Sequence, residues 1–332
     1  MPTLAIDAMS GDHGLRSSLP AAAKAIAEIP HLKLTLLGQK QAMLDECQRR
    51  AIDPSQFTLV DVPDVIGMDE SPAVALRKKQ DSSMYKAIEL LRDGQVEGVV
   101  SAGNTGALVA LSRFLLERSP GIRRPAMCAP LPGDGGDTYM LDLGANVDCK
   151  AEELVQFAEM GSALVTCLKG IEAPRVALLN IGEEASKGTE LVRQTAELLA
   201  AEPSLNYIGF IEGFDLFTHK ADVIVCDGFV GNIALKVCEG TASYISRQLK
   251  GRFRRSWYGL ISGLFVQPLL KNFKDDINPD EYNGAALLGL SGVVVKSHGG
   301  SSKKSFYSAI RHAAKAAEQD LPRRIAQQLT LT

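Results

Sequence analysis

The sequence lacks the short motifs that mark several large classes of enzyme. Its 332 residues contain no GxxxxGKS/T loop, no GxGxxG fingerprint, no HExxH pair and no GxSxG elbow. The chain therefore carries none of the signatures of P-loop nucleotide hydrolysis, Rossmann-type dinucleotide binding, zinc proteolysis or α/β-hydrolase chemistry.

The six cysteines form neither a CxxC pair nor a metal-ligand spacing. This usage predicts separate reduced thiols in a reducing cytoplasm and argues against a disulfide framework. A covalent cysteine mechanism would need a thiolate with an activating neighbour. No histidine stands near four of the thiols, which lie in or beside apolar segments, so we expect them to be buried and inert: Cys128, Cys149, Cys167 and Cys226.

The chain also lacks a long apolar run and an excess of basic charge. No stretch reaches the roughly 18 apolar residues that a membrane-spanning helix needs. The opening MPTLAIDAMSGD has neither the basic nor the apolar region of a signal peptide. The formal net charge of −3 argues against a general nucleic-acid partner. We therefore expect a cytoplasmic protein, associated with a membrane at most peripherally.

Short apolar runs alternate regularly with longer segments of helical periodicity. Such alternation predicts an α/β fold with three αβα layers, in which helices cover both faces of a largely parallel sheet. No repeat or linker marks a boundary, so residues 1–332 are expected to form one domain, or two closely joined lobes. The predicted strands are Leu4–Ile6, Leu34–Leu37, Phe57–Val60, Gly98–Val100, Ala126–Ala129, Tyr139–Leu143, Val176–Leu179, Tyr207–Phe210 and Val223–Cys226, and the predicted helices include Ser71–Leu91, Leu108–Glu117, Glu152–Lys169, Glu190–Ala200 and Asn232–Arg247.

Polar, glycine-rich loops follow several of the predicted strands. Ligands of parallel α/β sheets bind beyond the carboxyl ends of the strands, so we expect these loops to meet at one end of the sheet. Glycine lets the backbone approach a ligand closely, and the N–H groups that begin a following helix attract an anion. Together the loops predict a polar cleft suited to phosphate, although each alone is also an ordinary turn. They comprise residues 7–14, 101–106, 142–146, 180–189 and 227–232, and a further loop at 297–304 precedes a last helix.

Seven motifs in or near these loops stand in a fixed order: Asp7-Ala-Met-x-Gly-Asp12, Ser101-Ala-Gly-Asn-Thr-Gly106, Leu141-Asp-Leu-Gly-Ala-Asn146, Asn180-Ile-Gly-Glu-Glu184 with Lys187-Gly188, Gly209-Phe-Ile-Glu-Gly213, Asp227-Gly-Phe-x-Gly-Asn232 and Lys296-Ser-His-Gly299. Together they resemble the bacterial phosphate acyltransferase family, also called acyl-ACP:phosphate acyltransferase. The chain departs from the family at Ser10, which is more often glycine, and at the inserted Gly300.

The resemblance implies a fold similar to phosphotransacetylases and isopropylmalate dehydrogenases, and a homodimer. It also implies an activity: formation of acyl phosphate from long-chain acyl-[acyl carrier protein] and inorganic phosphate. This reaction is an early step in bacterial phospholipid synthesis.

This chemistry needs no nucleophile from the enzyme, because phosphate itself attacks the thioester. The enzyme has to hold a dianion about 3–3.5 Å from the carbonyl carbon and to stabilise the oxyanion that forms. In our hypothesis Asn232 donates to the oxyanion or orients the phosphate, and His298 supplies charge or a proton to the departing thiolate. The alternatives are structural, with Lys187 as a helix cap or ion-pair partner and Asn232 as a helix N-cap. Phosphate binding is assigned to Lys187 and to four loop residues, Gly103, Asn104, Thr105 and Gly106.

Five further polar residues are given supporting roles. The acidic ones are scattered along the chain, so we expect them to orient Lys187 or backbone amides instead of binding a metal. We expect no cofactor. These residues are Asp7, Asp12, Asp142, Asn146 and Asp227.

A basic, apolar segment occupies residues 241–275. It has seven cations and no acidic residue before Asp275, and its apolar middle is interrupted by glycines and Pro268. Three interpretations stay open: contact with an anionic membrane surface or a membrane-bound acyltransferase, contact with acidic acyl carrier protein or the dimer partner, and an ordinary core hairpin. The candidate contact residues are Arg252, Arg254, Arg255, Trp257, Leu260, Leu264 and Phe265.

Three rival functions remain. A phosphotransacetylase acting on acyl-CoA would share the phosphate cleft. A nicotinamide-dependent dehydrogenase of similar fold should carry an adenine-ribose site and paired metal-binding aspartates, which we do not find in the sequence. A non-catalytic acyl-carrier or membrane adaptor would depend mainly on the basic segment.

Overall fold

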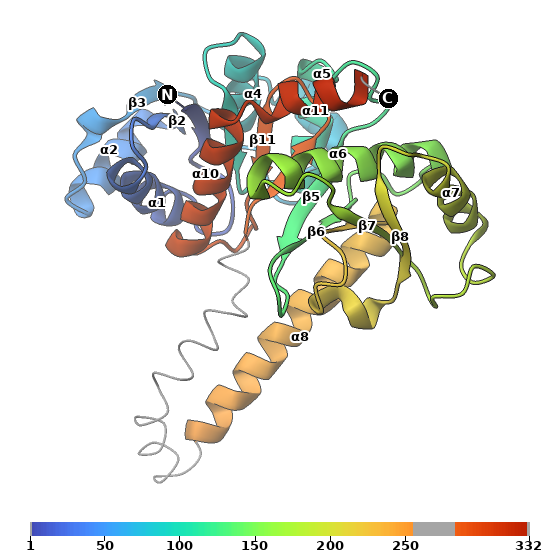
Figure 1. Cartoon of the computed structure of the whole chain (residues 1–332). Coiled ribbons are helices and arrows are strands. Elements are labelled where there is room, and N and C mark those ends of the chain that lie inside the picture. The colour runs from blue at the N-terminus through green and yellow to red at the C-terminus, as the bar shows by residue number, and fades with distance from the viewer. Residues whose placement is uncertain (1, 255–282, 331–332) are drawn as a thin grey trace.

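The structure, a computed structural model, describes residues 2–254 and 283–330 (Figure 1). Its strands are β1 (Thr3–Asp7), β2 (Lys33–Gly38), β3 (Thr58–Asp61), β4 (Gly98–Ser101), β5 (Ala126–Leu131), β6 (Thr138–Leu141), β7 (Arg175–Leu179), β8 (Asn206–Ile211), β9 (Val223–Val225), β10 (Ala285–Leu288) and β11 (Val293–Lys296). Its α-helices are α1 (Leu15–Glu28), α2 (Lys40–Arg49), α3 (Pro72–Lys78), α4 (Ser83–Arg92), α5 (Thr105–Leu115), α6 (Ala151–Lys169), α7 (Glu190–Ala200), α8 (Gly228–Arg254), α10 (Lys303–Glu318) and α11 (Leu321–Thr330), with 3-10 turns η1 (Pro54–Gln56) and η2 (Gly213–Phe217).

The described strands form one sheet of eleven, in the order β3-β2-β1-β4-β11-β10-β5-β6-β9-β7-β8. Strand β10 runs antiparallel to both β11 and β5, and β5 runs antiparallel to β6, whereas the other pairs are parallel. The three antiparallel pairs reverse the direction of the strands halfway across the sheet. The prediction of a largely parallel sheet is confirmed.

The reversal corrects the prediction that all the polar loops leave one end of the sheet. Strands β1, β4 and β11 run parallel, so the loops after them leave the same edge. Strands β6, β9 and β7 point the opposite way, and their loops leave the opposite edge. The candidate residues therefore fall into two groups, and any contact between the groups has to be made by helices that cross the sheet.

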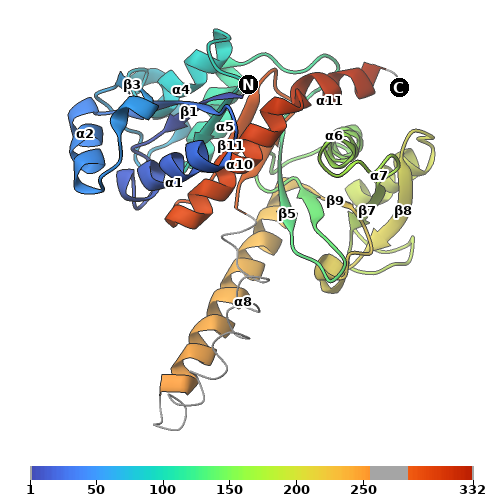
Figure 2. The ribbon, with the colours of Figure 1, turned by 60° about the vertical axis from the view of Figure 1, so that its left-hand side comes forward.

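Residue alternation along the strands divides the core between the two faces of the sheet. On β1, Leu4 and Ile6 belong to the core cluster that includes residues of α1, α6, α10 and α11. Ala5 between them belongs to the cluster that includes residues of α4 and α5. Figure 2 shows the sheet between these two sets of helices. This arrangement confirms the predicted three layers.

The predicted helix Ser71–Leu91 is two helices, α3 and α4. Helix α3 ends at Lys78, and the Lys79 ammonium reaches Asp64 Oδ1 at 2.9 Å. Ser82 then begins a new helix, because its hydroxyl accepts the backbone N–H of Tyr85 at 3.3 Å. The hydroxyl cap and the ion pair together explain the break.

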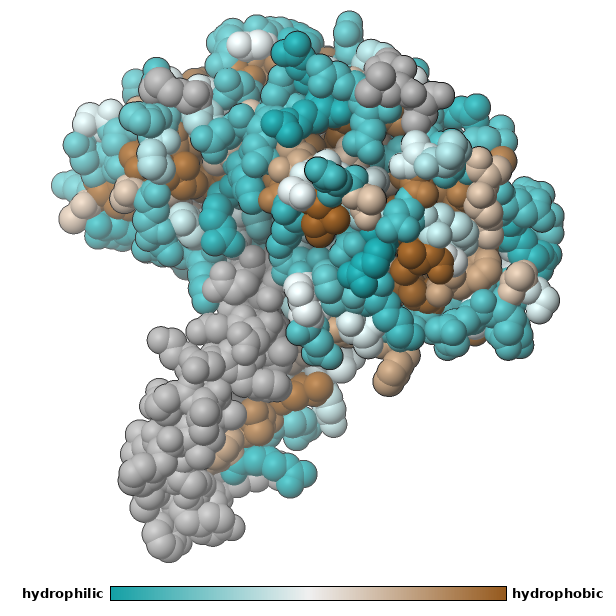
Figure 3. All heavy atoms as spheres, in the orientation of Figure 1, coloured by the Kyte–Doolittle hydropathy of each residue, from teal (hydrophilic) through white to brown (hydrophobic). Residues whose placement is uncertain are grey.

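Helix α8 projects from the body of the molecule, as Figures 1 and 2 both show. Its described part carries exposed apolar side chains, visible as brown atoms in Figure 3. Among the described helices, none is both long and apolar enough to cross a membrane. The exposed apolar residues of α8 are Phe229, Val230, Ile233, Val237, Tyr244, Ile245 and Leu249.

Candidate active site

Asp142 is a buried carboxylate directly after β6. Its Oδ1 accepts the backbone N–H groups of Met127 at 2.8 Å and Ala145 at 3.1 Å. Its Oδ2 accepts the backbone N–H and the side-chain amide of Asn146, at 2.6 and 2.9 Å. Burial raises the pKa of Asp142, whereas these donors lower it. Since all four partners donate, they favour the ionised carboxylate, which fixes the turn after β6.

Helix α8 begins in direct contact with this turn. The backbone N–H of Gly228 donates to the Asn146 carbonyl at 2.8 Å. A Cβ atom on Gly228 would lie 2.5 Å from the same oxygen, and one on Gly231 would lie 2.0 Å from the Asp142 carbonyl oxygen. Glycine at both positions therefore allows the helix to approach the Asp142 turn this closely.

Asp227 caps α8 and so sets the position of Asn232. Its Oδ1 accepts the backbone N–H groups of Phe229 and Val230, both at 2.9 Å. The interpretation of Asn232 as the N-cap is therefore wrong, because it lies beyond the first turn. Its side chain is exposed and lies over Gly144, where a Cβ atom would be 3.4 Å from Asn232 Cβ.

Asp7 is a second buried carboxylate, at the end of β1. Its Oδ1 and Oδ2 accept the hydroxyls of Ser83 and Ser101, each at 2.6 Å. The Ser10 hydroxyl lies 3.3 Å from that of Ser101, so the residue that departs from the family motif joins the same cluster. Burial raises the pKa of Asp7, and the hydroxyl donors partly offset this shift. In the described part of the chain, no group of three or more His, Cys, Asp or Glu residues could hold a metal ion.

Lys296 is a functional candidate that sequence reasoning missed. It ends β11 in register with Ser101 of β4, and its side chain is 8% exposed. Its Nζ donates to the carbonyl oxygens of Ala102, at 3.5 Å, and Ser297. Burial, followed by repulsion from Lys236, lowers the pKa of Lys296 to about 8. The signal in the sequence is a lysine that ends an otherwise apolar strand, Val-Val-Val-Lys.

Asn104 begins α5 and has its side chain committed to the protein. Its Oδ1 accepts the backbone N–H of Ala107 at 3.0 Å, and its Nδ2 donates to the carbonyls of Met68 at 2.8 Å and Glu70 at 2.9 Å. The Gly103 N–H donates to the Ser101 hydroxyl at 3.0 Å. Among the described residues, the N–H groups of Thr105 and Gly106 in the first turn of α5 have no hydrogen-bond partner.

His298 and Asp12 lie in loops that contact each other. The Asp12 backbone N–H donates to the Gly299 carbonyl at 2.8 Å. His298 is exposed, and its Nδ1 accepts the Gly300 N–H at 3.1 Å. Its Nε2 lies 3.8 Å from Glu239 Oε2, on α8. The predicted residues Asp7, Asp12 and His298 are thus brought together with Lys296 and the loop after β4.

Two helices connect this group with the Asp142 group. Helix α8 starts on the Asp142 turn, and Glu239 of the same helix reaches His298. Helix α5 starts at the other edge and runs beside the Gly144 turn. An open groove of about 480 Å³ lies between α5 and the Gly144 turn. It is lined by Pro72, Gly106, Val109, Ala110, Arg113, Phe114, Gly144 and Ala145.

Lys187 lies in an exposed loop that leaves the same edge as Asp142 and Asp227. Its backbone hydrogen bonds are local, to Glu184 and Asn180. Thr189 caps α7 by accepting the Val192 N–H, so the interpretation of Lys187 as a helix cap is wrong. Within the described residues Lys187 forms no ion pair. In residues 2–254 and 283–330, no hydrogen bond or ion pair joins Lys187 to the two groups above.

The thiols lie in environments that oppose ionisation. Cys128, Cys167 and Cys226 are buried as predicted, whereas Cys149 is only half-buried. Burial raises the pKa of all four, that of Cys149 to about 12. A thiolate nucleophile at neutral pH is disfavoured at each position.

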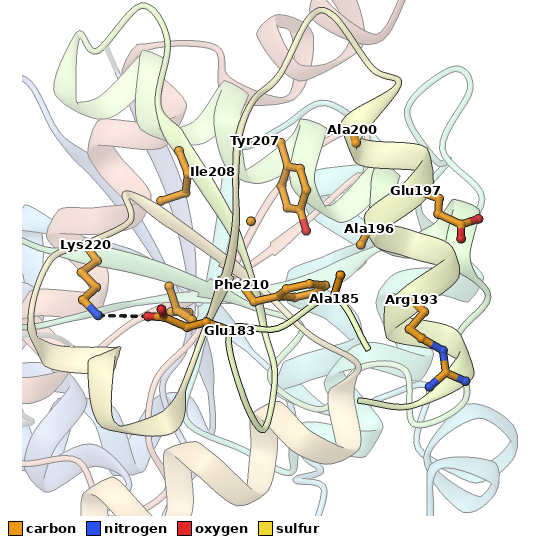
Figure 4. A pocket seen from close by; sticks show the side chains of 12 residues that line it. Glu183, Ala185, Arg193, Ala196, Glu197, Ala200, Tyr207, Ile208, Phe210 and Lys220 are labelled. Carbon is orange, nitrogen blue, oxygen red and sulfur yellow. Dashed lines mark hydrogen bonds and ion pairs between the residues drawn. The ribbon is translucent and has the colours of Figure 1, made fainter. Parts of the chain in front are cut away.

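A larger hollow, of about 830 Å³, lies along the edge strand β8 (Figure 4). Strand β8 contains one extra residue relative to β7, since Tyr207 pairs with Val176 while Phe210 pairs with Leu178. This bulge places Tyr207 and Phe210 on the side facing α7, as Figure 4 shows. Glu183 and Ala185, from the loop of Lys187, line the same hollow.

Most of the predicted contact residues of the basic segment lie outside the described residues. Arg252 is exposed near the end of α8, and Arg254 is the last residue of that helix. The others lie outside: Arg255, Trp257, Leu260, Leu264 and Phe265.

Known proteins resemble the chain over almost its whole length. The sequence profile of the family described as "Fatty acid synthesis protein" matches residues 2–324. A phosphate acyltransferase from Alcanivorax borkumensis is 48% identical over 328 residues, which cover 98% of this chain and 97% of that protein. A phosphate acyltransferase from Pseudomonas fluorescens (strain Pf0-1) is 51% identical over 324 residues, which cover 97% of this chain and 96% of that protein.

Solved structures share the fold at low sequence identity. A phosphotransacetylase from Streptococcus pyogenes matches with a TM-score of 0.64 and 19% identity, covering 96% of this chain and 94% of that one. A 4-hydroxythreonine-4-phosphate dehydrogenase from Klebsiella pneumoniae matches with a TM-score of 0.54 and 13% identity, covering 95% and 98%. These similarities confirm the predicted phosphotransacetylase-like fold. Together with the profile and the close relatives, they lead to one conclusion: the chain belongs to the fatty acid synthesis protein family, among its phosphate acyltransferases.

Proposed function

We propose that the chain transfers a long-chain acyl group from the thioester of acyl carrier protein to inorganic phosphate. A phosphate oxygen attacks the carbonyl carbon, the carbon–sulfur bond breaks, and the carrier leaves as a thiol once its sulfur has taken a proton. The acyltransferase activity follows from the family. The carrier as donor, and an early place in bacterial phospholipid synthesis, are the proposed parts.

The position of Asn232 carries the proposal. The cap at Asp227 and the close contact of α8 with Asp142 fix the start of the helix, so that the Asn232 side chain lies over Gly144, a residue that lines the groove beside α5. A donor carried by a fixed helix needs little rearrangement as negative charge develops, which is how oxyanion-stabilising groups work. Asn232 is therefore assigned to the oxyanion or to the orientation of phosphate.

The start of α5 is assigned to phosphate. The N–H groups of Thr105 and Gly106, which have no partner in the part of the chain that the structure describes, are donors of the kind that bind anions at helix N-termini. Asn104 would act through the backbone, because its side chain anchors loop 67–70. Gly103 allows close packing before the helix, because a Cβ atom there would lie 2.4 Å from Met84 Cε. Lys187 would bring positive charge from the opposite edge.

His298 is assigned to the leaving thiolate. Its Nδ1 accepts the Gly300 N–H, so the neutral ring carries its proton on Nε2. His298 Nε2 lies 3.8 Å from Oε2 of Glu239, a residue of α8. To act as the acid, the ring would first take up a second proton at Nδ1 and give up the Gly300 contact, and Glu239 would stabilise the resulting imidazolium. The imidazolium then passes its Nε2 proton to the departing sulfur and is left neutral.

The partners are proposed from the surface of α8. Its exposed apolar side chains suit a homodimer contact. The basic segment 241–275 suits acidic acyl carrier protein or the surface of an anionic membrane, where a second, membrane-bound acyltransferase would consume the acyl phosphate. A cytoplasmic protein with peripheral membrane contact fits this proposal.

A phosphotransacetylase acting on acyl-CoA is the second candidate, favoured by the fold shared with the Streptococcus pyogenes enzyme. The test compares palmitoyl carrier protein with palmitoyl-CoA and acetyl-CoA in phosphate buffer, with acyl phosphate trapped as the hydroxamate. The proposal expects the carrier thioester to be the preferred donor. A higher kcat/KM for either coenzyme A ester would contradict it in favour of the second candidate.

A further inference from the structure

We propose that Lys296 and Lys236 together bind the inorganic phosphate dianion, between the end of β11 and the third turn of α8. This inference rests on the proposed function and deepens it, because it names the cations of the phosphate site. It differs from the assignment of phosphate to Lys187.

The first argument is that Lys296 is buried and has no counter-ion in the described part of the chain. Its residue is 8% exposed, and the hydrogen bonds of its Nζ within that part go to the backbone carbonyls of Ala102 and Ser297. Among the described residues, no carboxylate oxygen lies within 4.0 Å of this nitrogen. A buried ammonium without an anion is costly, and buried charges in proteins are normally paired. An anion that binds here would supply the missing partner.

The nearby acidic groups do not fill this role. Ser101 of β4 lies between Asp7 of β1 and Lys296 of β11 in the sheet, and both carboxylate oxygens of Asp7 accept serine hydroxyls. Asp12 is exposed, and Glu239 is paired with Lys236 at 2.8 Å. These three carboxylates favour the charged form of Lys296 only from a distance.

The second argument is the like charge that faces Lys296 from α8. Lys236 is close enough for its charge to lower the pKa of Lys296, after burial, which is the larger cause. Two ammonium groups that repel each other become a binding site when an oxyanion lies between them, because its two attractions outweigh the one repulsion. Lys236 and Asn232 lie four residues apart on α8, so they share one face of that helix.

The site should respond to pH. With its pKa lowered to about 8, Lys296 is charged at neutral pH and loses its proton as the pH rises through 8. Inorganic phosphate is already a dianion in that range, so the loss of affinity would come from the protein. The titratable groups that face Lys296 are Asp7, Asp12, Lys236, Glu239 and His298. The Lys296→Arg variant separates the titration of Lys296 from theirs, because arginine keeps its charge throughout this range.

The test measures KM for inorganic phosphate with the full chain. Lys296→Met should raise this KM at least about tenfold, the change expected on losing a charge-assisted hydrogen bond. Lys236→Met should raise it less, because Lys236 is exposed, and Lys296→Arg should restore part of the affinity. The KM for the acyl donor should stay within about twofold, and the exposed control Lys33→Met should change neither constant. In the wild type, the phosphate KM should rise above pH 8, and this rise should be absent in Lys296→Arg.

Three results would overturn the inference. The first is an unchanged phosphate KM in Lys296→Met, and the second is a pH profile that Lys296→Arg leaves unaltered. The third is a raised KM for the acyl donor alone, which would assign the site to the phosphodiester of the carrier. Calorimetric titration of inorganic phosphate into each protein separates this inference from the proposed function, since it needs no turnover. Binding to the wild type and not to Lys296→Met supports the site even if no acyl phosphate forms, whereas equal binding or none to both refutes it.

Discussion

Gly231 lies so close to Asp142 that a Cβ atom on the glycine would be 2.0 Å from the Asp142 carbonyl oxygen. The start of α8 and the turn after β6 therefore form one unit. Since α8 carries Asn232, the chemistry at one end of the sheet depends on this contact.

Gly231→Ala should displace the start of α8. We expect an overpacking cost of about 1–3 kcal/mol in the free energy of unfolding, together with a loss of acyl phosphate formation. Gly240→Ala is the matched control, because a Cβ atom there meets nothing within 4 Å. It should stabilise the helix by about 0.5–1 kcal/mol. Equal stability of the two variants in urea unfolding would show that α8 does not need this close approach.

Asp142→Asn should destabilise the protein, because an amide cannot accept four N–H donors as the carboxylate does. The expected loss is about 2–3 kcal/mol, that of a hydrogen bond to a charged group together with an unsatisfied buried donor. Chemical denaturation measures it, with the exposed Asp45→Asn as the control. A change of less than about 0.5 kcal/mol would mean that this carboxylate does not hold the turn.

Asn232→Ala should leave the fold intact, since the side chain is exposed and Asp227 provides the cap. Turnover should fall roughly 10²-fold or more, as for other lost transition-state donors. Steady-state kinetics and thermal unfolding measure the two effects separately. A variant that keeps normal kcat removes Asn232 from the mechanism.

Lys187→Ala is expected to lower turnover by a similar factor, roughly 10²-fold, if Lys187 closes over the bound phosphate. Its exposed position predicts an unchanged melting temperature. Because the backbone hydrogen bonds of Lys187 are local, normal turnover in this variant would bear on the Lys187 side chain alone. Near-normal acyl phosphate synthesis would exclude Lys187 and leave Lys296 as the principal cation.

His312 should make stability depend on pH below neutrality. Burial lowers the pKa of His312 to about 4, below its ordinary value of 6.5. The unfolded chain then binds more protons than the folded one between these values, so stability should fall as the pH decreases from 6.5 to 4. His312→Gln should flatten this part of the profile in urea titrations at several pH values. An identical slope in the wild type and in His312→Gln would assign the acid sensitivity to other groups.

The sequence predicted nine strands because their apolar runs are short and bounded by glycine and polar residues. It did not identify β10 and β11, which follow the basic segment and are joined by a short turn. These two strands contribute to two of the three antiparallel pairs, and the third, between β5 and β6, completes the reversal of half of the sheet. A pattern of alternating strands and helices contains no information about such a reversal, so the common edge was predicted wrongly.

Local sequence patterns also predicted only part of the candidate site. The motifs placed Asp142, Asn146 and Asp227 in one neighbourhood, because each follows a strand and precedes a turn. Lys296 stands within one of the motifs, but no local pattern assigns it a role, because its lack of a counter-ion among the described residues depends on residues distant in sequence. The anchoring of Asn104 to loop 67–70 is likewise a tertiary contact that no local pattern predicts.

The central claim is that phosphate attacks the thioester directly, without an acylated enzyme. The direct test is the release of carrier thiol when enzyme and palmitoyl carrier protein are mixed at equal concentrations, with and without phosphate. The account predicts thiol release only with phosphate, accompanied by an equal amount of acyl phosphate. A stoichiometric burst of thiol without phosphate, with the acyl mass retained on the protein, would contradict it.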